Sequence, residues 1–517
     1  MLFSPATTGS HGLSTPRSLL QNAPVTPPPS SSTAQTLQDF EPLLLAELIV
    51  LRAAADGSIA KVGYRRPRNA TPDVRLRAEF LAFLAQGGGT GAPVVGGRLQ
   101  VLGACIVGRL DLSRTRVPIS LWLYRCVFGT APIFDGAYIA GSLSMPDTGL
   151  PGLHAQGTRI DGELALNAGC SVHGELDLAR AVIGRDLNCE RLHLVPSDKF
   201  ANTLPCRLIA ENAQIGGDVI LSGGADIVGE LRLQDIRVRG DLRISSARLS
   251  AGLDASGARG VALNLDRARI GGHLMLDAGF SAAGQVRLQR ARIGGDLDAT
   301  GADFDAVGDA GWGDTAAVLL DRAKIGGALV LTQLLRPLEG TSLVDARVGT
   351  LRDDAMTWGT HHVLDGFAFK RFGGEAPTDA TMRLGWLATQ RASPFGDDYR
   401  PEPWRQVIKV LRRMGRDSSA SEVAIGREHY LRHAGLIGLG LPSAMRWLAR
   451  AGHALYGLLA GYGHRPLRLL FVTGLVWLAC TFGLTPKLTG LEAACGWFAS
   501  FTLLWIASTL GDRDRRV

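Results

Sequence analysis

The residues ARIGGHLML from Ala268 recur as ARIGGDLDA from Ala291 and as AKIGGALVL from Ala323. Their shared pattern is A-x-I-x-G-x-L-x-L, in which apolar residues alternate with other residues. Alternation with a period of two is typical of a β-strand, whose successive side chains point to opposite faces. The glycine between the isoleucine and the first leucine indicates a bend or a close backbone approach. Each unit is therefore predicted to be a short strand, a corner and a second short strand.

The unit recurs along much of the chain, which indicates a repeat architecture. Its third position is occupied by Ile215, Ile227, Val238, Leu249, Ile270, Ile293, Ile325 and Val348. Successive members are 12, 11, 11, 21, 23, 32 and 23 residues apart, which are one, two or three multiples of about 11. Two units, about 22 residues, are expected to close one coil. We therefore predict a mainly β fold, a right-handed parallel β-helix solenoid over residues 96–352, with Ala, Ile and Leu inside.

The composition agrees with such a solenoid and limits the alternatives. Glycine accounts for 65 of 517 residues without a collagen-like period, which fits repeated corners. Seven cysteines form no C-x-x-C motif, so a reducing compartment is expected rather than a disulfide framework. The net charge of +7 is modest for this length and is compatible with a weak preference for anionic partners or membranes.

Two segments precede the predicted solenoid. Residues 1–35 are rich in Ser, Thr and Pro and are predicted to be a disordered tail, and no secretory signal is expected. Residues 36–95 are predicted to form a helical cap, because an open solenoid end would expose unpaired strand edges. The cap is expected to contain a helix over 36–56 and a second helix from about Pro72 to Gln86. Thr71 or Asp73 is expected to cap the second helix, and its apolar face is Leu76, Phe80, Leu81 and Leu84.

A helical domain is predicted after the solenoid, over residues 353–440. Pro403 at a helix start and Gly415 between two helical segments indicate a helical hairpin, with Asp417 or Ser418 capping its second helix. An amphipathic interfacial helix is predicted over 441–466.

Two apolar runs near the end of the chain predict a membrane anchor over 467–512. The runs 469–484 and 493–510 contain no charged residue, with lengths slightly below the usual ~20 residues. Basic residues flank the pair, including Arg465 and Arg468 before it and Arg513 after it, so both flanks are expected in the cytoplasm. The alternative is a buried helical pair in a soluble domain.

Several motifs together resemble a bacterial family of β-helical, C-terminally membrane-anchored proteins, often labelled membrane-associated oxidoreductases. The matching motifs are RLRAEFLAFL from Arg75, GACIVGRLDL from Gly103, LDGFAFKRF from Leu364, PEPWRQVIKVLRRMG from Pro401 and GYGHRP from Gly461. The resemblance covers nearly all of the chain after residue 40 and implies the architecture and a bacterial inner-membrane location. The resemblance implies no catalytic residue in this chain. The family carries a longer segment between the two spans than this chain does.

No motif for a cofactor or a catalytic site is recognisable. The chain contains no G-x-G-x-x-G between a strand and a helix, no C-x-x-C-H and no P-loop. We therefore predict no catalytic, cofactor-binding or metal-binding residue, and no cofactor. His361 and His362, near Asp353 and Asp354, would point to opposite faces of a strand, so solvation or packing in a cap is expected for them. Glu163, Glu175, Asp218, Glu230, Asp241 and Asp296 could form a carboxylate cluster of the kind found in carbohydrate-active β-helices, but surface charges paired to cations are favoured.

Basic residues form a more specific pattern. Arg267, Arg290 and Arg322 occupy one repeat position, and Arg269, Arg292 and Lys324 occupy another two residues later, extended by Arg248 and Arg347. Side chains two residues apart share a face of a strand, so two parallel cationic columns are predicted. Stacked like charges repel, and either the nearby Asp266, Asp321 and Asp345 or an anionic partner must offset them. Lipid headgroups or an acidic protein are the possible partners. Nucleic acid is not expected, because no aromatic residues interleave the columns.

These patterns favour a non-catalytic, membrane-anchored scaffold or binding protein at the cytoplasmic face of the bacterial inner membrane. The predicted contacts are two membrane spans and an anionic surface bound by Arg267, Arg269, Arg290, Arg292, Arg322 and Lys324. The alternative, suggested by the family resemblance, is a membrane-associated oxidoreductase whose cofactor site has no recognisable motif.

Overall fold

The computed structural model describes residues 36–89, 91–196, 207–251, 260–305, 316–390, 401–433, 436–438, 442–464, 468 and 471–475. The tail predicted over 1–35 and nearly all of the two predicted membrane spans lie outside these residues. Among the helices that fall within the described ranges, none combines the length and the apolar character needed to span a bilayer.

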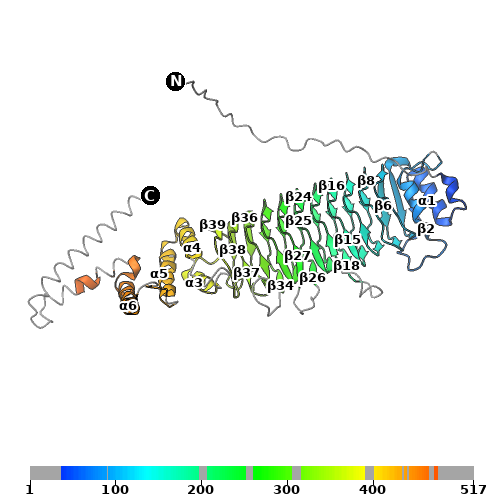
Figure 1. Cartoon of the computed structure of the whole chain (residues 1–517). Coiled ribbons are helices and arrows are strands. Elements are labelled where there is room, and N and C mark those ends of the chain that lie inside the picture. Colours follow the sequence, from blue (N-terminus) through cyan, green and yellow to red (C-terminus); the bar gives the residue numbers. More distant parts are fainter. Residues whose placement is uncertain are drawn as a thin grey trace, which may run out of the picture. The chain divides into compact units, whose positions relative to one another are not determined.

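Parallel strands dominate the described part of the chain and form three all-parallel sheets. One passage of the chain contains β28 (Arg269–Ile270), β29 (Leu274–Met275), β30 (Ser281–Ala283) and β31 (Gln285–Arg287). The next passage contains β32 (Arg292–Ile293), β33 (Leu297–Asp298), β34 (Asp303–Asp305) and β35 (Val318–Leu319). Each strand of the first passage pairs in parallel with its counterpart in the second. The chain thus returns to the same ladders one rung further on, which is the connectivity of a β-helix-like solenoid (Figure 1).

The predicted inward positions are correct. Ile270 pairs with Ile293, and Ile293 pairs with Ile325 in β36 (Lys324–Leu331), all three in register. Their exposed fractions are only 3–4%. The alternate repeat units occupy a different sheet, where Ile227 pairs with Leu249. Two sequence units therefore make one coil, as the 11-residue spacing predicted.

The 32-residue spacing from Ile293 to Ile325 differs from the prediction of three repeat units. Because these two residues pair directly, the 32 residues form a single coil with a longer connection. The same holds for Val238 and Ile270, which also pair directly. Extra residues between strands leave the register of the ladders unchanged. The number of residues between two repeat positions therefore did not show how many coils separate them.

Glycine is required at the corner between the two short strands of a unit. A Cβ atom on Gly294 would lie 2.2 Å from the carbonyl oxygen of Gly271 on the preceding coil, and one on Gly271 would lie equally close to that of Arg239. Such distances are far below any van der Waals contact. The repeated glycine of the sequence pattern therefore allows the coils to stack closely at this corner.

The solenoid extends beyond both predicted bounds. At its start, β1 (Ile59–Lys61) pairs with β3 (Arg98–Leu102), and β2 (Arg75–Arg77) pairs with β4 (Cys105–Val107). At its other end, β39 (Ala368–Phe372) pairs with β38 (Arg347–Asp353). The added strands β1, β2 and β39 lie outside the predicted range 96–352.

The N-terminal helices are shorter than predicted. The segment 36–56 contains a 3-10 turn, Leu37–Phe40, and α1 (Leu45–Asp56), with Pro42 between them. In the segment 72–86, β2 replaces the expected first helical turn, and α2 runs only from Ala78 to Ala85. The N-cap position is therefore Arg77 rather than Thr71 or Asp73. Strand pairing with β4 provides the backbone partners of this segment and overrides its helical periodicity. The four predicted apolar residues are nevertheless all buried.

Helices follow the last strand of the solenoid: α3 (Ala380–Ala388), α4 (Glu402–Arg413), α5 (Asp417–His433) and α6 (Ser443–Ala460), then the 3-10 turn η3 (Gly461–Gly463). The hairpin of α4 and α5 turns at Gly415, whose φ is 73°. α4 lies on the last rung, where Gln406 Nε2 donates a hydrogen bond to the carbonyl oxygen of Phe369 (2.6 Å). Trp404 and Leu411 of α4 are buried, so the helix covers the open end of the solenoid.

Candidate functional site

One corner of each coil adopts the left-handed backbone conformation. On five successive coils its residues are Asp235, Arg267, Arg290, Arg322 and Asp345, with φ between 55° and 60°. We call this set the corner column. Each backbone N–H bonds to the next coil; that of Arg290, for example, donates to the carbonyl oxygen of Asp321 (2.7 Å). The backbone is thereby fixed, and the exposed guanidinium groups point to solvent.

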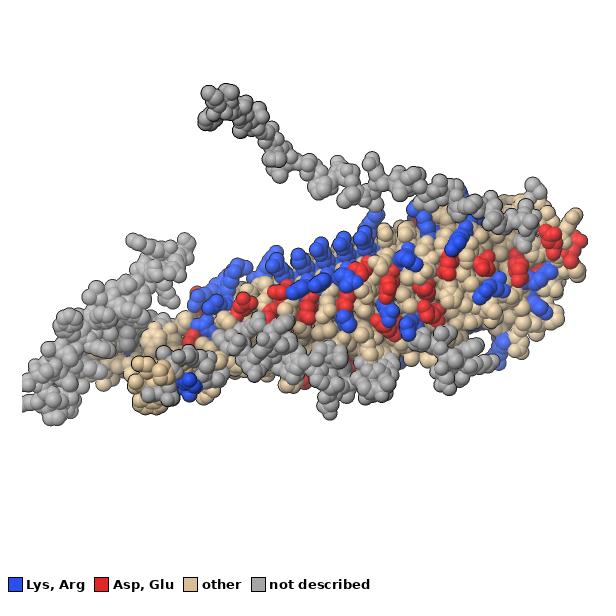
Figure 2. All heavy atoms as spheres, in the orientation of Figure 1, with Lys and Arg blue, Asp and Glu red and all other residues tan. Residues whose placement is uncertain are grey.

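A second set of cations lies two residues further along each coil. Its members are Arg237, Arg269, Arg292, Lys324 and Arg347, and we call this set the strand column. Each is exposed and pairs in register with the next: Arg237 with Arg269, then Arg292, Lys324 and Arg347. In-register strands are about 4.8 Å apart, so the side chains form a closely spaced row. Lys and Arg side chains gather along one edge of the stacked coils, the edge where Figure 1 labels β24 (Arg237–Val238) and β36 (Figure 2).

The structure brings together all six residues predicted to bind an anionic surface. Arg347 extends the strand column as predicted, but Arg248 does not, because its strand β26 (Arg248–Ser250) belongs to another sheet. Sequence reasoning missed Arg237. Its position directly before Val238, a residue already assigned to the repeat, was the signal that could have identified it.

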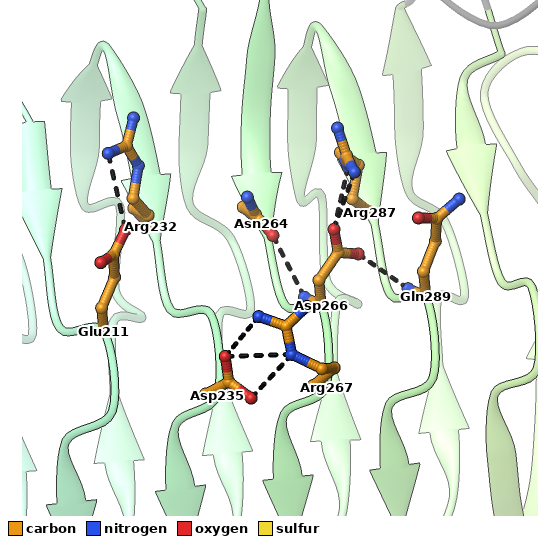
Figure 3. Close-up of polar contacts among 8 residues, drawn as sticks. All are labelled: Glu211, Arg232, Asp235, Asn264, Asp266, Arg267, Arg287 and Gln289. Atoms are coloured by element: carbon orange, nitrogen blue, oxygen red, sulfur yellow. Dashed lines mark hydrogen bonds and ion pairs between the residues drawn. The ribbon is translucent and has the colours of Figure 1, made fainter.

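Carboxylates offset the two ends of the corner column. Arg267 Nη2 lies 2.6 Å from Asp235 Oδ2, and Arg267 Nε contacts both oxygens of the same carboxylate (Figure 3). This hydrogen-bonded pair raises the pKa of the Arg267 guanidinium and lowers the pKa of Asp235. At the other end, Arg322 Nε lies 3.6 Å from Asp345 Oδ2, in a pair whose side chains are both 59% exposed.

Two of the three acids predicted to neutralise the columns have other partners. Asp266 forms an ion pair with Arg287 (2.8 Å) and accepts the backbone N–H of Gln289 (2.9 Å) (Figure 3). Asp321 accepts hydrogen bonds from the Ser342 hydroxyl and from Gln289 Nε2. Only Asp345 contacts a column residue, and Asp235 is the partner that the sequence did not reveal.

The strand column, in contrast, has no matching carboxylates. Within the described residues, none of its five cations lies within 4 Å of an acidic oxygen, and neither does Arg290 of the corner column. Arg237 and Arg269 act on Asp235 only at longer range, where they add to the lowering of its pKa. Together the two columns hold eight cations and two carboxylates, so an uncompensated positive charge remains on this edge.

The six carboxylates considered as a catalytic cluster do not share one face. Glu175 and Glu230 lie in β15 (Glu175–Asp177) and β23 (Glu230–Arg232) of the eight-stranded sheet, whereas Asp218, Asp241 and Asp296 lie at the glycine corner of their coils. Glu163 occupies a corner as well, where its own N–H donates to Ser142 Oγ.

The corner aspartates bind backbone groups of the next coil. Asp218 accepts the N–H of Asp241, Asp241 accepts that of His273, and Asp296 accepts that of Ala328, at 2.6–2.9 Å. The bond from His273 is the main cause that lowers the pKa of Asp241, with Arg243 adding to it. These carboxylates hold adjacent coils together, and Arg243 contacts both Asp218 and Asp241 (3.1 and 3.0 Å).

The histidine pair is divided between solvent and the core. His361 is exposed, whereas His362 is buried with its ring edge-on to Trp358 (centroids 5.2 Å apart). Burial lowers the pKa of His362, which favours its neutral form. Asp353 is held by Arg383 rather than by a histidine (2.6 Å). In the described part of the chain, no three His, Cys, Asp or Glu side chains are grouped as metal ligands.

The four described cysteines lie inside the solenoid. Burial raises the pKa of Cys126 and of Cys170 to about 12, and it raises the pKa of Cys105 and Cys189 as well. Neutral, enclosed thiols are poor nucleophiles, so burial disfavours nucleophilic chemistry at these four cysteines.

Comparison of the chain with protein-family models, with curated proteins and with solved structures gave no match. The two cationic columns are therefore the candidate site on the strength of their geometry alone.

Proposed function

We propose that this protein is a non-catalytic binding scaffold that lies against an anionic lipid surface through its corner and strand columns. The observation that carries the proposal is the strand column, in which five cations occupy consecutive coils without an ion-pair partner among the described residues. Three other arginines of the solenoid, Arg232, Arg243 and Arg287, each contact a carboxylate.

The spacing of the strand column favours a ligand with many negative charges. Two unit charges about 5 Å apart repel by roughly 1 kcal/mol in bulk water, before screening by salt. The spacing is shorter than the Debye length of about 8 Å at physiological ionic strength, so the potentials of the five cations add. An anionic surface would relieve this repulsion, with a gain of up to about 1 kcal/mol per cation near an acidic membrane.

A membrane is the anionic surface that the rest of the chain favours. We propose that the apolar runs 469–484 and 493–510 are a two-span anchor in the bacterial inner membrane and that both of its flanks are cytoplasmic. We also propose that the solenoid is a closed right-handed β-helix, the handedness that crossover connections prefer. The basic residues around the spans and the basic edge of the solenoid would then face the same anionic leaflet.

The proposal predicts salt-sensitive binding of residues 36–440 to vesicles. This piece retains the whole described core, which runs from Phe40 to Ala424. We expect it to bind phosphatidylglycerol-containing vesicles at low salt, to bind less at moderate salt, and not to bind vesicles of phosphatidylcholine alone. Replacing the six predicted cations with Gln should abolish the binding without changing the melting temperature. Replacing only Arg269, Arg292 and Lys324 should weaken it on the order of 100-fold, from about 1 kcal/mol per cation.

The matched control is a variant with Arg75, Arg98 and Arg109 replaced by Gln. These residues are exposed and lie outside both columns. The control loses three positive charges, as does the variant of Arg269, Arg292 and Lys324. An equal loss of binding in this control would show that net charge, not the columns, drives association. Binding to an acidic protein without binding to anionic vesicles would also contradict the proposed lipid ligand.

A further inference from the structure

Helix α6 carries a continuous stripe of exposed apolar side chains. Trp447, Leu448, Leu455 and Leu458 are 56–71% exposed. Their spacing places them, with Ala451, within about a third of the helix circumference, the pattern of an amphipathic face. Large apolar side chains that gather on one exposed face usually mark an interaction surface.

The opposite face of α6 is fixed against α5 and η3. His453 Nε2 lies 3.2 Å from Glu428 Oε2 of α5. Burial raises the pKa of the Glu428 carboxyl, but the hydrogen bonds from Arg427 and then from His453 outweigh it and lower the pKa. The His453 ring packs on the ring of Tyr462 (centroids 4.6 Å apart). At Gly457 even a Cβ atom would lie 2.3 Å from the Tyr462 ring, so α6 approaches η3 closely there. These contacts set the rotation of α6, and they direct the apolar stripe away from α5.

We propose that this stripe lies in the headgroup boundary of an anionic bilayer, with α6 parallel to the membrane surface. The inference deepens the proposed function and rests on its membrane attachment, but not on the cationic columns. The charge and the sequence around the stripe favour lipid as the partner that covers it.

The charge around α6 suits an acidic lipid surface. From residue 429 to residue 491 the chain contains no Asp or Glu, whereas Arg432, Arg446, Arg450, Arg465 and Arg468 all lie in this interval. Arg446 and Arg450 belong to α6 itself, and Arg450 lies about 60° from Trp447 around the helix, so a basic group borders the apolar stripe. An apolar face bordered by arginine, with a tryptophan, is typical of helices that lie in the membrane interface.

The chain beyond α6 is also apolar. The run 469–484 begins a few residues after η3, and its described residues Phe471 and Leu475 are 72% and 56% exposed. A helix that lies in the interface would bring this run directly to the bilayer. The competing occupant of the stripe is the C-terminal part of the chain itself, over 476–517, and the experiment must distinguish the two.

Spin labels on the full chain can make this distinction. Leu458→Cys places a label on the stripe, and Met445→Cys places one on an equally apolar, exposed position about 140° away around the helix. Both are made with Cys206, Cys480 and Cys495 replaced by Ser, and the protein is reconstituted in vesicles of phosphatidylcholine and phosphatidylglycerol. Collisions of each label with molecular oxygen, which enters lipid, and with a water-soluble nickel chelate are then measured.

We expect the Leu458 label to collide severalfold more with oxygen than with the chelate, and the Met445 label to show the reverse. Equal access of the chelate to both labels would overturn the inference, because α6 would then lie in water. Low access of both reagents to the Leu458 label would overturn it as well, since protein would cover the stripe. Repeating the measurement in the six-fold Gln variant separates the two proposals: lipid contact at Leu458 should persist even if the columns bind nothing.

Discussion

Arg269 and Ile270 are neighbours in the chain and lie in opposite environments. Arg269 is exposed in the strand column, whereas Ile270 is 3% exposed and stacks on Ile293 and Val238. The alternation of a β-strand separates them, and the repeat then multiplies the separation over adjacent coils. On these coils the cation lies outside and its apolar neighbour lies inside. The charged edge and the core can therefore be tested independently.

At this scale we predict that Ile270→Asp lowers the free energy of unfolding by about 4 kcal/mol, because a carboxylate in the apolar stack is unpaired. Arg269→Gln is the control and should change it by no more than about 0.5 kcal/mol, since it alters only an exposed side chain. Urea unfolding of residues 36–440 measures both. A small effect of Ile270→Asp would mean that the inward phase of the repeat is wrong.

Among the elements, strand β38 and helix α3 are joined by a buried ion pair. Arg383 Nη1 lies 2.6 Å from Asp353 Oδ2, both side chains are fully buried, and Trp358 Nε1 donates to the same oxygen (2.7 Å). Arg383 also lies over the Phe372 ring, 3.9 Å from its centroid. The pair therefore attaches the first C-terminal helix to the last rungs of the solenoid, where the sheet ladders end.

We predict that Arg383→Met lowers the free energy of unfolding by about 3–5 kcal/mol, because Asp353 is left buried without its counter-charge. The double variant with Asp353→Leu should be more stable than Arg383→Met alone, since it removes the unpaired charge. Arg322→Met, in the exposed pair with Asp345, should cost less than about 1 kcal/mol. Equal effects of Arg383→Met and Arg322→Met would show that the buried pair does not attach α3 to the solenoid.

On the scale of the whole molecule, the proposal combines three separate contacts with one membrane. The predicted spans would insert, α6 would lie in the interface, and the columns would bind anionic headgroups. Each contact uses a different force: apolar transfer for the spans, partial burial for α6 and electrostatics for the columns. High salt should therefore release the columns while leaving the protein attached.

The corresponding prediction concerns the full chain in bacterial cells. We expect it to remain in membranes after a carbonate wash, and a reporter fused after Val517 to behave as cytoplasmic, because basic residues flank both runs. Recovery of the full chain in the soluble fraction would contradict the anchor. A reporter exposed on the outer side of the membrane would contradict the proposed orientation instead.

The sequence by itself determined the strand period, the inward residues and the cationic columns. These features depend on local alternation, and a repeat places equal positions in register wherever coils stack. The six predicted cations therefore met on adjacent coils even though 32 residues separate Arg290 from Arg322.

Only the tertiary structure decided which residues complete this pattern. β1 and β2 are too short to show a repeat, and they become strands because β3 and β4 offer paired edges. The pairing of Asp235 with Arg267, and of Asp353 with Arg383, joins residues 32 and 30 positions apart, so it depends on how coils and cap are stacked. Sequence periodicity reports the direction of each side chain, whereas the partner that it meets depends on distances between segments that only the folded chain brings together.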